Sequence, residues 1–466
     1  SIDSPGGTVS ASNELYKVIK DFKERNKIKI YFHTNELLTS GAYWASMSGD
    51  KIFANYGSLI GNIGLGHVRY ATRGSADREE EAQPFYVNAP YGIILVHNGN
   101  LTNTGKLRQS MEEFGSIFRT SSDSEIVLHL IAKSNESELS SMIADALNKV
   151  EGAYSILFLS EKQLVGVRDP YGFRPLCLGQ LGDAFVLASE TCALDIMNAE
   201  YIREVEPGEM VIIDEHGIQS IFPFQKEKSA SCIFEYIYFS RPDSILENKS
   251  VYEHRKNLGK ELAKESSIES DLIVPVPDSG VPAAIGYAEH MKKSVEFGII
   301  RNHYVGRTFI EPSKKIRSFG VKLKLSPNKT LIKNKSIILI DDSIVRGTTS
   351  IKIVKMMYEA GAKEVHLRIA CPQIKFPDYY GVDTPDKNEL LAAKKNLKEM
   401  CKFIGVDSLE FLSIDGLYRA MGHEKRNKLY PQYTDHYFTG DYPVEPSDSL
   451  KENNENQLSL LTSRSS

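Results

Sequence analysis

The sequence predicts a chain of mixed α/β and α+β domains, and three observations lead to this prediction. The chain has 466 residues, which is enough for two or three domains with separate cores. From about residue 66 to 225, strand patterns follow one another with turns between them, as in an α+β domain. From about residue 226 onward, apolar strands alternate with helices, which is typical of a parallel α/β sheet.

Composition excludes several classes of partner. The 56 Lys and Arg residues nearly balance the 61 Asp and Glu residues, so a net charge of −5 predicts no nucleic-acid partner. The sequence has no run of 18 apolar residues and no signal peptide at its start, so we expect no membrane association. The five cysteines are scattered without a CxxC pair, which favours reduced thiols in a cytoplasmic protein and no zinc site.

The local elements are predicted in chain order. "SPGG" is a turn, "SNELYKVIKDFKERN" has helical periodicity and "KIKIYFH" is a short strand. Further strands are expected at "YGIILVHNGN", "AYSILFLS", "AFVLAS" and "EMVIIDEHG". A helix begins at "SSDSEIVLHLIAKS", where Ser122 and Glu125 have the spacing of a capping box.

The segment "IILIDDSIVRGTT" combines a buried strand, two acids and a loop that leads into a helix. The strand Ile337–Ile340 ends at Asp341 and Asp342, and the loop runs through Gly347 to the helix. Backbone N–H groups at such a junction bind phosphate. The two acids suit ribose hydroxyls, a Mg²⁺ ion or a developing positive charge, whereas "DD" alone is also compatible with a solvated turn.

Two neighbouring segments extend this interpretation. "VPVPDSG", residues 274–280, is a second loop at a strand end with free backbone donors, although "PDSG" by itself is an ordinary turn. Residues 301–325 carry seven basic side chains, which suit either a solvated face or a flap that closes over an anionic substrate: Arg301, Arg307, Lys314, Lys315, Arg317, Lys322 and Lys324.

These loops, together with "FEYIYFSRPDS", "VYEHRKNLG" and "LSIDGL", resemble the glutamine phosphoribosylpyrophosphate (PRPP) amidotransferase family over residues 64–445. The resemblance implies a type I phosphoribosyltransferase sheet that makes 5-phosphoribosylamine, the first step of purine (IMP) synthesis, from PRPP and glutamine or ammonia. It implies catalytic roles for Asp341 and Asp342, and Mg²⁺ held by Ser279, Asp341 and Asp342. It also implies these substrate-binding residues: Asp278, Ser279, Arg307, Ser343, Arg346, Gly347, Thr348 and Thr349. Purine nucleotides are expected as inhibitors, and the chain is expected to form a homo-oligomer.

The same resemblance implies an Ntn-hydrolase αββα sandwich that releases ammonia from glutamine. "GHVRYAT" places Arg69 and Thr72 against the glutamine α-carboxylate, and "SSDSE" places Asp123 against the α-amino group. "HNGN" places Asn98 and Gly99 at the oxyanion hole, although this motif alone is often a hairpin turn.

The chain departs from the family pattern in two places. The family's nucleophile is an amino-terminal cysteine, but no cysteine here precedes Cys177, so we expect an enzyme that uses ammonia and an incomplete or partly disordered amidotransferase domain. Some members hold an iron–sulfur cluster on four cysteines. Cys232 takes the first ligand position here and Asp378 stands at the second, so no cluster is predicted.

The first 64 residues resemble the S49 family of signal-peptide peptidases, which have a crotonase-like fold. "DSPGG" and "LLTSGAYWASMSGDKIFANYGSLIGNIG" carry this resemblance, which makes Ser40 the nucleophile. The base lysine of a Ser–Lys dyad would lie beyond the point where the chain changes family, and Lys51 is not that base. The junction lies within Gly61–Gly64, which both families share.

The predicted organisation is therefore a peptidase-like fragment at 1–64, a truncated amidotransferase domain at 65–225, a phosphoribosyltransferase domain at 226–445 and a disordered tail at 446–466. An amidophosphoribosyltransferase is the predicted function. The alternatives are a serine peptidase and a non-catalytic chimera that at most binds PRPP.

Overall fold

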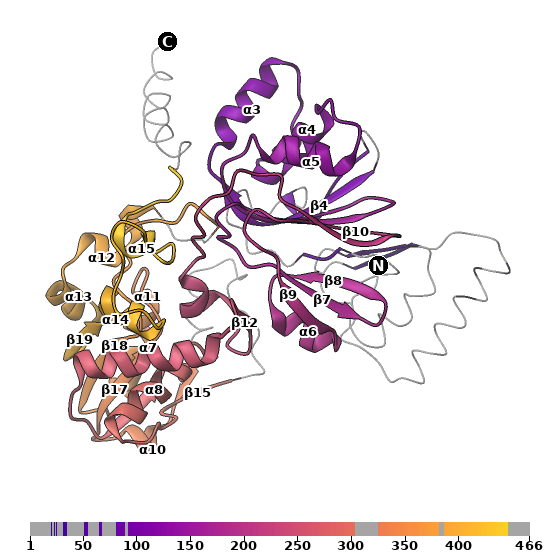
Figure 1. The fold of residues 1–466 in the computed structure, drawn as a ribbon. Helices are drawn as coiled ribbons and strands as arrows, with labels where there is room; N and C mark the ends of the chain where they lie inside the picture. Colours follow the sequence, from indigo (N-terminus) through magenta and orange to yellow (C-terminus); the bar gives the residue numbers. More distant parts are fainter. Residues whose placement is uncertain are drawn as a thin grey trace, which may run out of the picture.

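The computed structural model describes residues 31–34, 51–54, 65–67, 81–88, 92–302, 325–381 and 386–445, together with Lys20, Lys23 and Arg25. Two sheet-based domains meet along a seam in this structure (Figure 1). The first contains the strands between residues 85 and 221, and the second contains a parallel sheet between residues 272 and 411.

The first domain is built on an antiparallel sheet of six strands in the order β11-β10-β6-β5-β4-β3. Its strands are β3 (Phe85–Val87), β4 (Ile93–Leu101), β5 (Gly152–Leu159), β6 (Leu164–Arg168), β10 (Met210–Asp214) and β11 (Gly217–Ile221). Strands β4, β5 and β10 confirm the strands that the sequence predicts at these places. Every residue of β6 is buried, because both faces of the sheet are covered.

Helices cover one face of this sheet, and a second sheet covers the other (Figure 1). The helices are α3 (Thr104–Glu113), α4 (Asp123–Ala132) and α5 (Leu139–Leu147). The second sheet has the order β8-β7-β9, with β7 (Cys177–Leu181), β8 (Ala184–Ala188) and β9 (Glu200–Glu204), and α6 (Thr191–Met197) packs beneath it. The layers therefore run helix, sheet, sheet, helix, which confirms the predicted αββα sandwich.

The expectation of an incomplete or partly disordered amidotransferase domain stays a prediction, but its described residues 81–88 and 92–225 pack a core. The six-stranded sheet packs a continuous core against α4 and α5, which includes Ile126, Ile143 and Ile156. Leu176, Val205 and Val211 form a smaller buried cluster in the same domain.

The second domain has a parallel sheet in the order β14-β17-β18-β19, as the alternating pattern predicts. Its strands are β14 (Leu272–Pro275), β17 (Ser336–Asp341), β18 (Glu364–Ile369) and β19 (Ser408–Phe411). Its main helices are α7 (Val251–Ser266), α8 (Val281–Met291), α11 (Thr348–Glu359), α13 (Leu397–Ile404) and α14 (Ile414–Ala420). All six residues of β17 are buried, as expected for a central parallel strand.

Short elements complete the described part. They are β1 (Tyr31–Thr34), β2 (Lys51–Ala54), β12 (Ile245–Leu246), β13 (Lys249–Ser250), β15 (Ile299–Arg301), β16 (Leu325–Pro327), α10 (Lys329–Ile332), α12 (Leu391–Lys394), α15 (His436–Thr439), the π-helix η2 (Glu235–Phe239) and the 3₁₀ helix η4 (Lys387–Glu389). Strands β1 and β2 pair in parallel. Within the described residues, no helix combines the length and the apolar character that a membrane span needs.

Candidate active site

The predicted phosphate loop lies at the carboxyl end of β17. Asp341 is the last residue of the strand, and α11 begins at Thr348. Gly347 precedes the helix with a φ of 75°. The side chains of Thr348 and Thr349 are exposed at the first turn of the helix, where backbone N–H groups have no partner within the helix. This exposed helix start can therefore receive a phosphate group.

The two acids lie together at the same strand end. Both Asp341 and Asp342 are buried, and the backbone N–H of Asp342 donates to Asp341 Oδ1 over 3.0 Å. Burial raises the pKa of Asp341 well above its usual range, and the neighbouring Asp342 charge raises it further. These carboxylates are not a solvated turn, because they are held close together away from water.

The second predicted loop reaches the same point. Strands β14 and β17 are parallel neighbours in which Pro275 pairs with Ile340, so their carboxyl ends meet. The Ser343 hydroxyl donates to Asp342 Oδ1, and the Ser279 hydroxyl lies close enough to Asp342 to lower its pKa. Burial raises the pKa of Asp342, and these two hydroxyls oppose the shift. The structure thus brings together Asp342, Ser279 and Ser343 as the sequence predicts.

Arg255 is a member of this group that the sequence analysis missed. It lies on α7, and its guanidinium is buried and donates to the backbone oxygens of Tyr236, Glu235 and Ser240. Its charge lowers the pKa of Asp342. The "VYEHRKNLG" segment contains the arginine, but no local pattern in it shows that the side chain turns toward a loop about ninety residues further on.

Three more predicted binding residues are Asp278, Arg346 and Arg307. The first two form ion pairs with other side chains, and the third lies outside the described part. Asp278 pairs with Arg301 at the end of β15. Arg346 donates from Nε to Glu389 Oε2 over 2.8 Å, and both side chains are exposed. Arg307 and most of the predicted basic flap lie outside the described residues.

The oxygen groups at this strand end fit Mg²⁺. Two buried carboxylates with raised pKa values are stabilised in their charged forms by a cation, and the hydroxyl of Ser279 adds a hard oxygen ligand. The described residues contain no group of three or more His, Cys, Asp or Glu side chains arranged to hold a metal. A Mg²⁺ ion at Asp341 and Asp342 would therefore need substrate oxygens to complete its coordination.

The predicted glutamine site gathers around the second half of β4. Asn98 and Gly99 lie within the strand, opposite Ser155 and Tyr154 of β5, so "HNGN" is not a hairpin turn. Asp123 is the first residue of α4 and is buried, and its Oδ2 accepts the backbone N–H of Leu101 over 2.9 Å. The structure thus brings together Asn98, Gly99 and Asp123.

One edge of β4 offers backbone donors. The N–H of His97 donates to Gln83 Oε1 over 2.6 Å, and the N–H of Leu101 donates to Asp123. Alternate N–H groups of a strand point to the same edge, so the N–H of Gly99 faces the edge between these two anchored positions. This placement suits an oxyanion donor.

The capping box predicted at this helix is half wrong. Ser122 is the N-cap and accepts from the N–H of Ser124, as expected for a helix start. Glu125 does not reach back to Ser122. Its carboxylate accepts from the N–H groups of Arg119 and Thr120, each over 2.9 Å, and thereby fixes the loop before the helix.

The remaining predicted residues of this half lie outside the described part. These are Arg69 and Thr72 of "GHVRYAT", and Ser40 of the peptidase-like fragment. All five cysteines are described, and Cys177 and Cys192 lie on the second sheet and on α6. Burial raises the pKa of the Cys177 thiol to about 12, which is the opposite of what a nucleophile needs.

The positions compared with iron–sulfur ligands do meet in space. The Cys232 thiol lies 3.3 Å from the Tyr437 hydroxyl, and Asp378 Oδ1 lies 2.7 Å from His436 Nε2. Both members of the Asp378–His436 pair are fully buried. The Cys232 and Asp378 side chains thus each have a partner within the protein, and the expected lack of a cluster stays a prediction.

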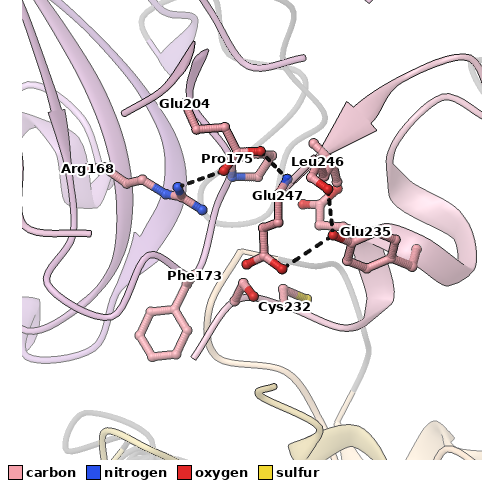
Figure 2. A pocket seen from close by; sticks show the side chains of 10 residues that line it. Arg168, Phe173, Pro175, Glu204, Cys232, Glu235, Leu246 and Glu247 are labelled. Carbon is pink, nitrogen blue, oxygen red and sulfur yellow. Dashed lines mark hydrogen bonds and ion pairs between the residues drawn. The ribbon is translucent and has the colours of Figure 1, made fainter. Parts of the chain in front are cut away.

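The two domains are joined along a polar seam (Figure 2). Arg168 and Glu204 of the first domain approach each other within 3.4 Å, and Glu204 accepts the N–H of Glu247 from the second domain. Arg174 pairs with Glu235 across the seam at 3.0 Å, and both side chains are almost completely buried. Such pairs are costly to break one partner at a time, so they fix how the domains meet.

The comparisons with known proteins agree with this division. Residues 67–195 match the family described as glutamine amidotransferase domain, and residues 242–398 match the phosphoribosyl transferase domain. The chain is 51% identical to the amidophosphoribosyltransferase of Rhizobium etli, covering 87% of this chain and 83% of that protein. It is 46% identical to the Bacillus subtilis amidophosphoribosyltransferase, covering 87% and 88%.

Solved structures give the same result. The chain superposes on the Bacillus subtilis glutamine PRPP amidotransferase complexed with ADP and GMP with a TM-score of 0.76. That match has 46% identity and covers 82% of this chain and 83% of the other. These comparisons give no support to the resemblance of residues 1–64 to a signal-peptide peptidase, or to the peptidase alternative.

Proposed function

Because the chain belongs to the amidophosphoribosyltransferase family, we propose that it forms 5-phosphoribosylamine from PRPP, the first step of purine synthesis. The observation that carries this proposal is the junction of two strand ends, where Asp341, Asp342 and Ser279 lie beside the phosphate-binding start of α11. The nitrogen comes from glutamine or ammonia.

The reaction replaces pyrophosphate by an amine at the anomeric carbon of the ribose. The bond from this carbon to the pyrophosphate oxygen breaks, and a bond to the ammonia nitrogen forms on the opposite face while the nitrogen loses a proton. The buried carboxylates of Asp341 and Asp342 hold the ribose hydroxyls and stabilise the positive charge that develops on the sugar. When bound, Mg²⁺ supplies charge neutralisation for the leaving pyrophosphate.

The remaining residues of this site bind the two phosphate groups. The backbone N–H groups of Gly347, Thr348 and Thr349 hold the 5′-phosphate, helped by the threonine hydroxyls and the helix dipole. The loop with Asp278 and Ser279 faces the pyrophosphate. The side chain of Arg346 is placed at the rim and leaves Glu389 when an anionic substrate binds.

The glutamine site supplies the ammonia in this proposal. Asp123 binds the α-amino group of glutamine, and Asn98 and Gly99 would donate to an oxyanion at the amide carbon. Burial raises the pKa of each of the five cysteine thiols, so the nucleophile that would attack the amide is not one of them. Arg69 and Thr72 bind the α-carboxylate. Purine nucleotides are proposed as inhibitors, since a related structure was solved with ADP and GMP, and a homo-oligomer is the proposed assembly.

The test is pyrophosphate release from PRPP and Mg²⁺, with ammonium or glutamine as the nitrogen source. Turnover with ammonium, lost in the variant that carries Asp341→Asn and Asp342→Asn, supports the transferase site. Turnover with glutamine as well supports the glutamine site. Turnover with ammonium but not with glutamine refutes only the glutamine part of the proposal. Silence with both nitrogen sources refutes the proposed activity.

A further inference from the structure

A segment of the second domain lies directly against the strand that carries the predicted oxyanion residues. A Cβ atom added to Gly381 would lie 2.7 Å from the carbonyl carbon of Gly99 and 2.8 Å from its Cα. On another side of Gly99, an added Cβ would lie 2.1 Å from the Ala153 oxygen. Gly99 is therefore enclosed between β5 and a loop that is about 280 residues away in the sequence.

A hydrogen bond joins the same two segments. Asn100 Nδ2 donates to the backbone oxygen of Tyr379 over 2.8 Å, next to the contact between Gly99 and Gly381. Gly381 has a φ of +108°, which an L-residue rarely adopts. Both the backbone conformation and the close approach thus depend on glycine at this position.

Asp378 fixes the shape of this loop. Its Oδ2 accepts the N–H of Tyr380 over 2.9 Å, and its Oδ1 bonds His436 Nε2 over 2.7 Å. The Tyr380 ring stacks on Phe173 of the first domain, with ring centroids 4.5 Å apart and an angle of 12° between the planes. The loop is therefore held to both domains by buried side chains.

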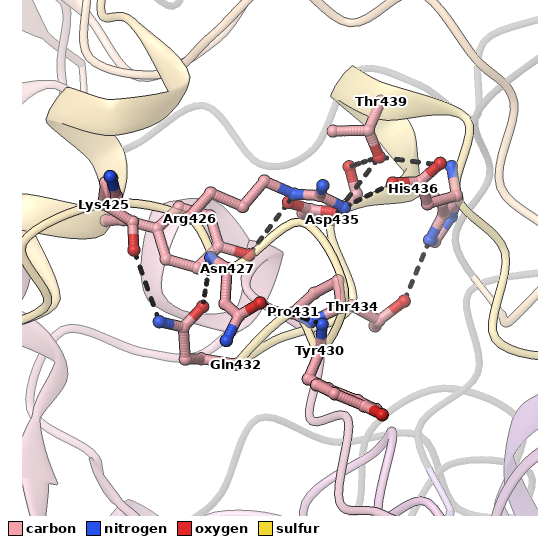
Figure 3. A network of polar contacts seen from close by, with 12 residues as sticks. Lys425, Arg426, Asn427, Tyr430, Pro431, Gln432, Thr434, Asp435, His436 and Thr439 are labelled. Atoms are coloured by element: carbon pink, nitrogen blue, oxygen red, sulfur yellow. Dashed lines mark hydrogen bonds and ion pairs between the residues drawn. The ribbon is translucent and has the colours of Figure 1, made fainter.

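His436 is in turn held by a polar network (Figure 3). Arg426 donates to Asp435 Oδ1 over 3.0 Å, and Thr439 Oγ1 donates to the same oxygen over 3.0 Å. Thr434 Oγ1 lies 3.3 Å from His436 Nδ1. These contacts fix the turn before α15 and hence the ring that pairs with Asp378.

We propose that Asp378 and Gly381 are positioning residues for the glutamine reaction, which act by pressing the 378–381 loop of the transferase domain against Gly99 and Asn100 of β4. Neither residue touches glutamine in this proposal. The loop keeps the Gly99 N–H directed at its strand edge, where a displaced strand would misplace an oxyanion donor. The inference rests on the proposed glutamine site and adds to it a contact from the other domain.

The first test is Gly381→Ala, with Gly422→Ala as the matched control. Gly422 also has a positive φ, of +88°, but an added Cβ there meets nothing within 4 Å. Glutamine-dependent turnover of Gly381→Ala is expected to fall by about tenfold or more relative to ammonium-dependent turnover, mainly in kcat, because an oxyanion interaction is made in the transition state. The control is expected to keep the wild-type ratio.

Hydrogen–deuterium exchange tests the contact without any need for turnover. In Gly381→Ala, amides of residues 93–101 are expected to exchange about tenfold faster than in the wild type or in Gly422→Ala. If wild-type protein does not use glutamine, the proposed glutamine activity is wrong while the exchange result still decides the contact. Unchanged exchange in this segment overturns the inference.

Asn100→Ala provides a second variant that adds no atoms. It removes the hydrogen bond to the Tyr379 oxygen together with a longer one to the Leu101 oxygen, and its expected effects on the turnover ratio and on exchange are smaller but in the same direction. Asp378→Asn keeps the shape of the side chain and is expected to retain more glutamine turnover than Asp378→Ala. Equal turnover ratios in all of these variants and the wild type would refute positioning by the loop.

Discussion

Replacing Asp341 by Asn, and Asp342 by Asn in a separate variant, tests the transferase site most directly. Both side chains are buried at the end of β17, six to seven residues before the start of α11, and the proposed function places the anomeric carbon of PRPP beside them. A unit charge about 4 Å from a developing cation contributes about 4 kcal/mol at an effective dielectric constant of about 20. Because about 1.4 kcal/mol corresponds to a tenfold change in rate, each substitution is expected to lower kcat about a thousandfold.

The structure also predicts what these variants keep. Asn has the shape of Asp without a charge to desolvate, so the free energy of unfolding of the Asp341→Asn variant is expected to stay the same or to rise. Asp342 lies beside Arg255, whose charge it compensates, so Asp342→Asn is expected to be the less stable of the two variants. Thermal unfolding of the purified variants measures this difference.

The assay is pyrophosphate release with ammonium as the nitrogen source and PRPP varied over a wide range, so that kcat and KM are separated. Asp415→Asn is the control, since Asp415 is exposed in the first turn of α14, away from the parallel sheet's phosphate loop. If both single variants keep a kcat within about threefold of the wild type, less than 1 kcal/mol of transition-state stabilisation came from these carboxylates, and the assignment is wrong.

Three further predictions concern other parts of the chain. Although burial raises the pKa of Glu125, its hydrogen bonds lower the pKa to about 2. Glu125→Ala should therefore cost about 1–3 kcal/mol of stability near pH 7, and this loss should shrink as the pH falls from about 4.5 to 2. Urea unfolding across this pH range measures the loss, and a loss that does not depend on pH contradicts the prediction. Arg346→Ala should raise the KM for PRPP at least tenfold. Glu389→Gln should lower this KM by no more than about fivefold, because an exposed ion pair contributes at most about 1 kcal/mol. Equal KM values in both variants would exclude a role of Arg346 in PRPP binding. Elemental analysis should find no stoichiometric iron, since Asp378 is hydrogen-bonded to His436 in the interior and Cys232 offers a single thiol; iron that is lost on Cys232→Ser would contradict this.

The transferase half could be predicted from the sequence because its signals are local and its topology is simple. The run Ile337–Ile340 shows a buried strand, and Gly347 marks the start of the next helix. In a parallel sheet the carboxyl ends of neighbouring strands meet, so the meeting of Ser279 with Asp342 follows from topology. Arg255 and Glu389 were missed because their contacts depend on packing between distant segments.

The glutamine half was predicted less completely, for a related reason. "HNGN" has the composition of a hairpin turn, and only the pairing of β4 with β5, which begins about fifty residues later, keeps it extended. Glu125 has the spacing of a capping box, yet the loop amides before the helix compete for its carboxylate and bind it instead. In both cases a tertiary partner overrides a local preference.

The Asp378–His436 pair shows why the seam between the domains could not be predicted. From the sequence, the only inference about Asp378 is that an aspartate stands where some members of the family have a cysteine that binds an iron–sulfur cluster. A buried carboxylate without a metal must find another positive or hydrogen-bonding partner, since an unpaired one costs several kcal/mol. The structure supplies His436 at 2.7 Å and the N–H of Tyr380 at 2.9 Å, and these bonds shape the loop that carries Gly381 to Gly99. The bonds that stabilise the buried Asp378 carboxylate therefore also determine how the transferase domain contacts the glutamine site. A substitution of Asp378 or His436 is expected to lower glutamine-dependent turnover more than ammonium-dependent turnover.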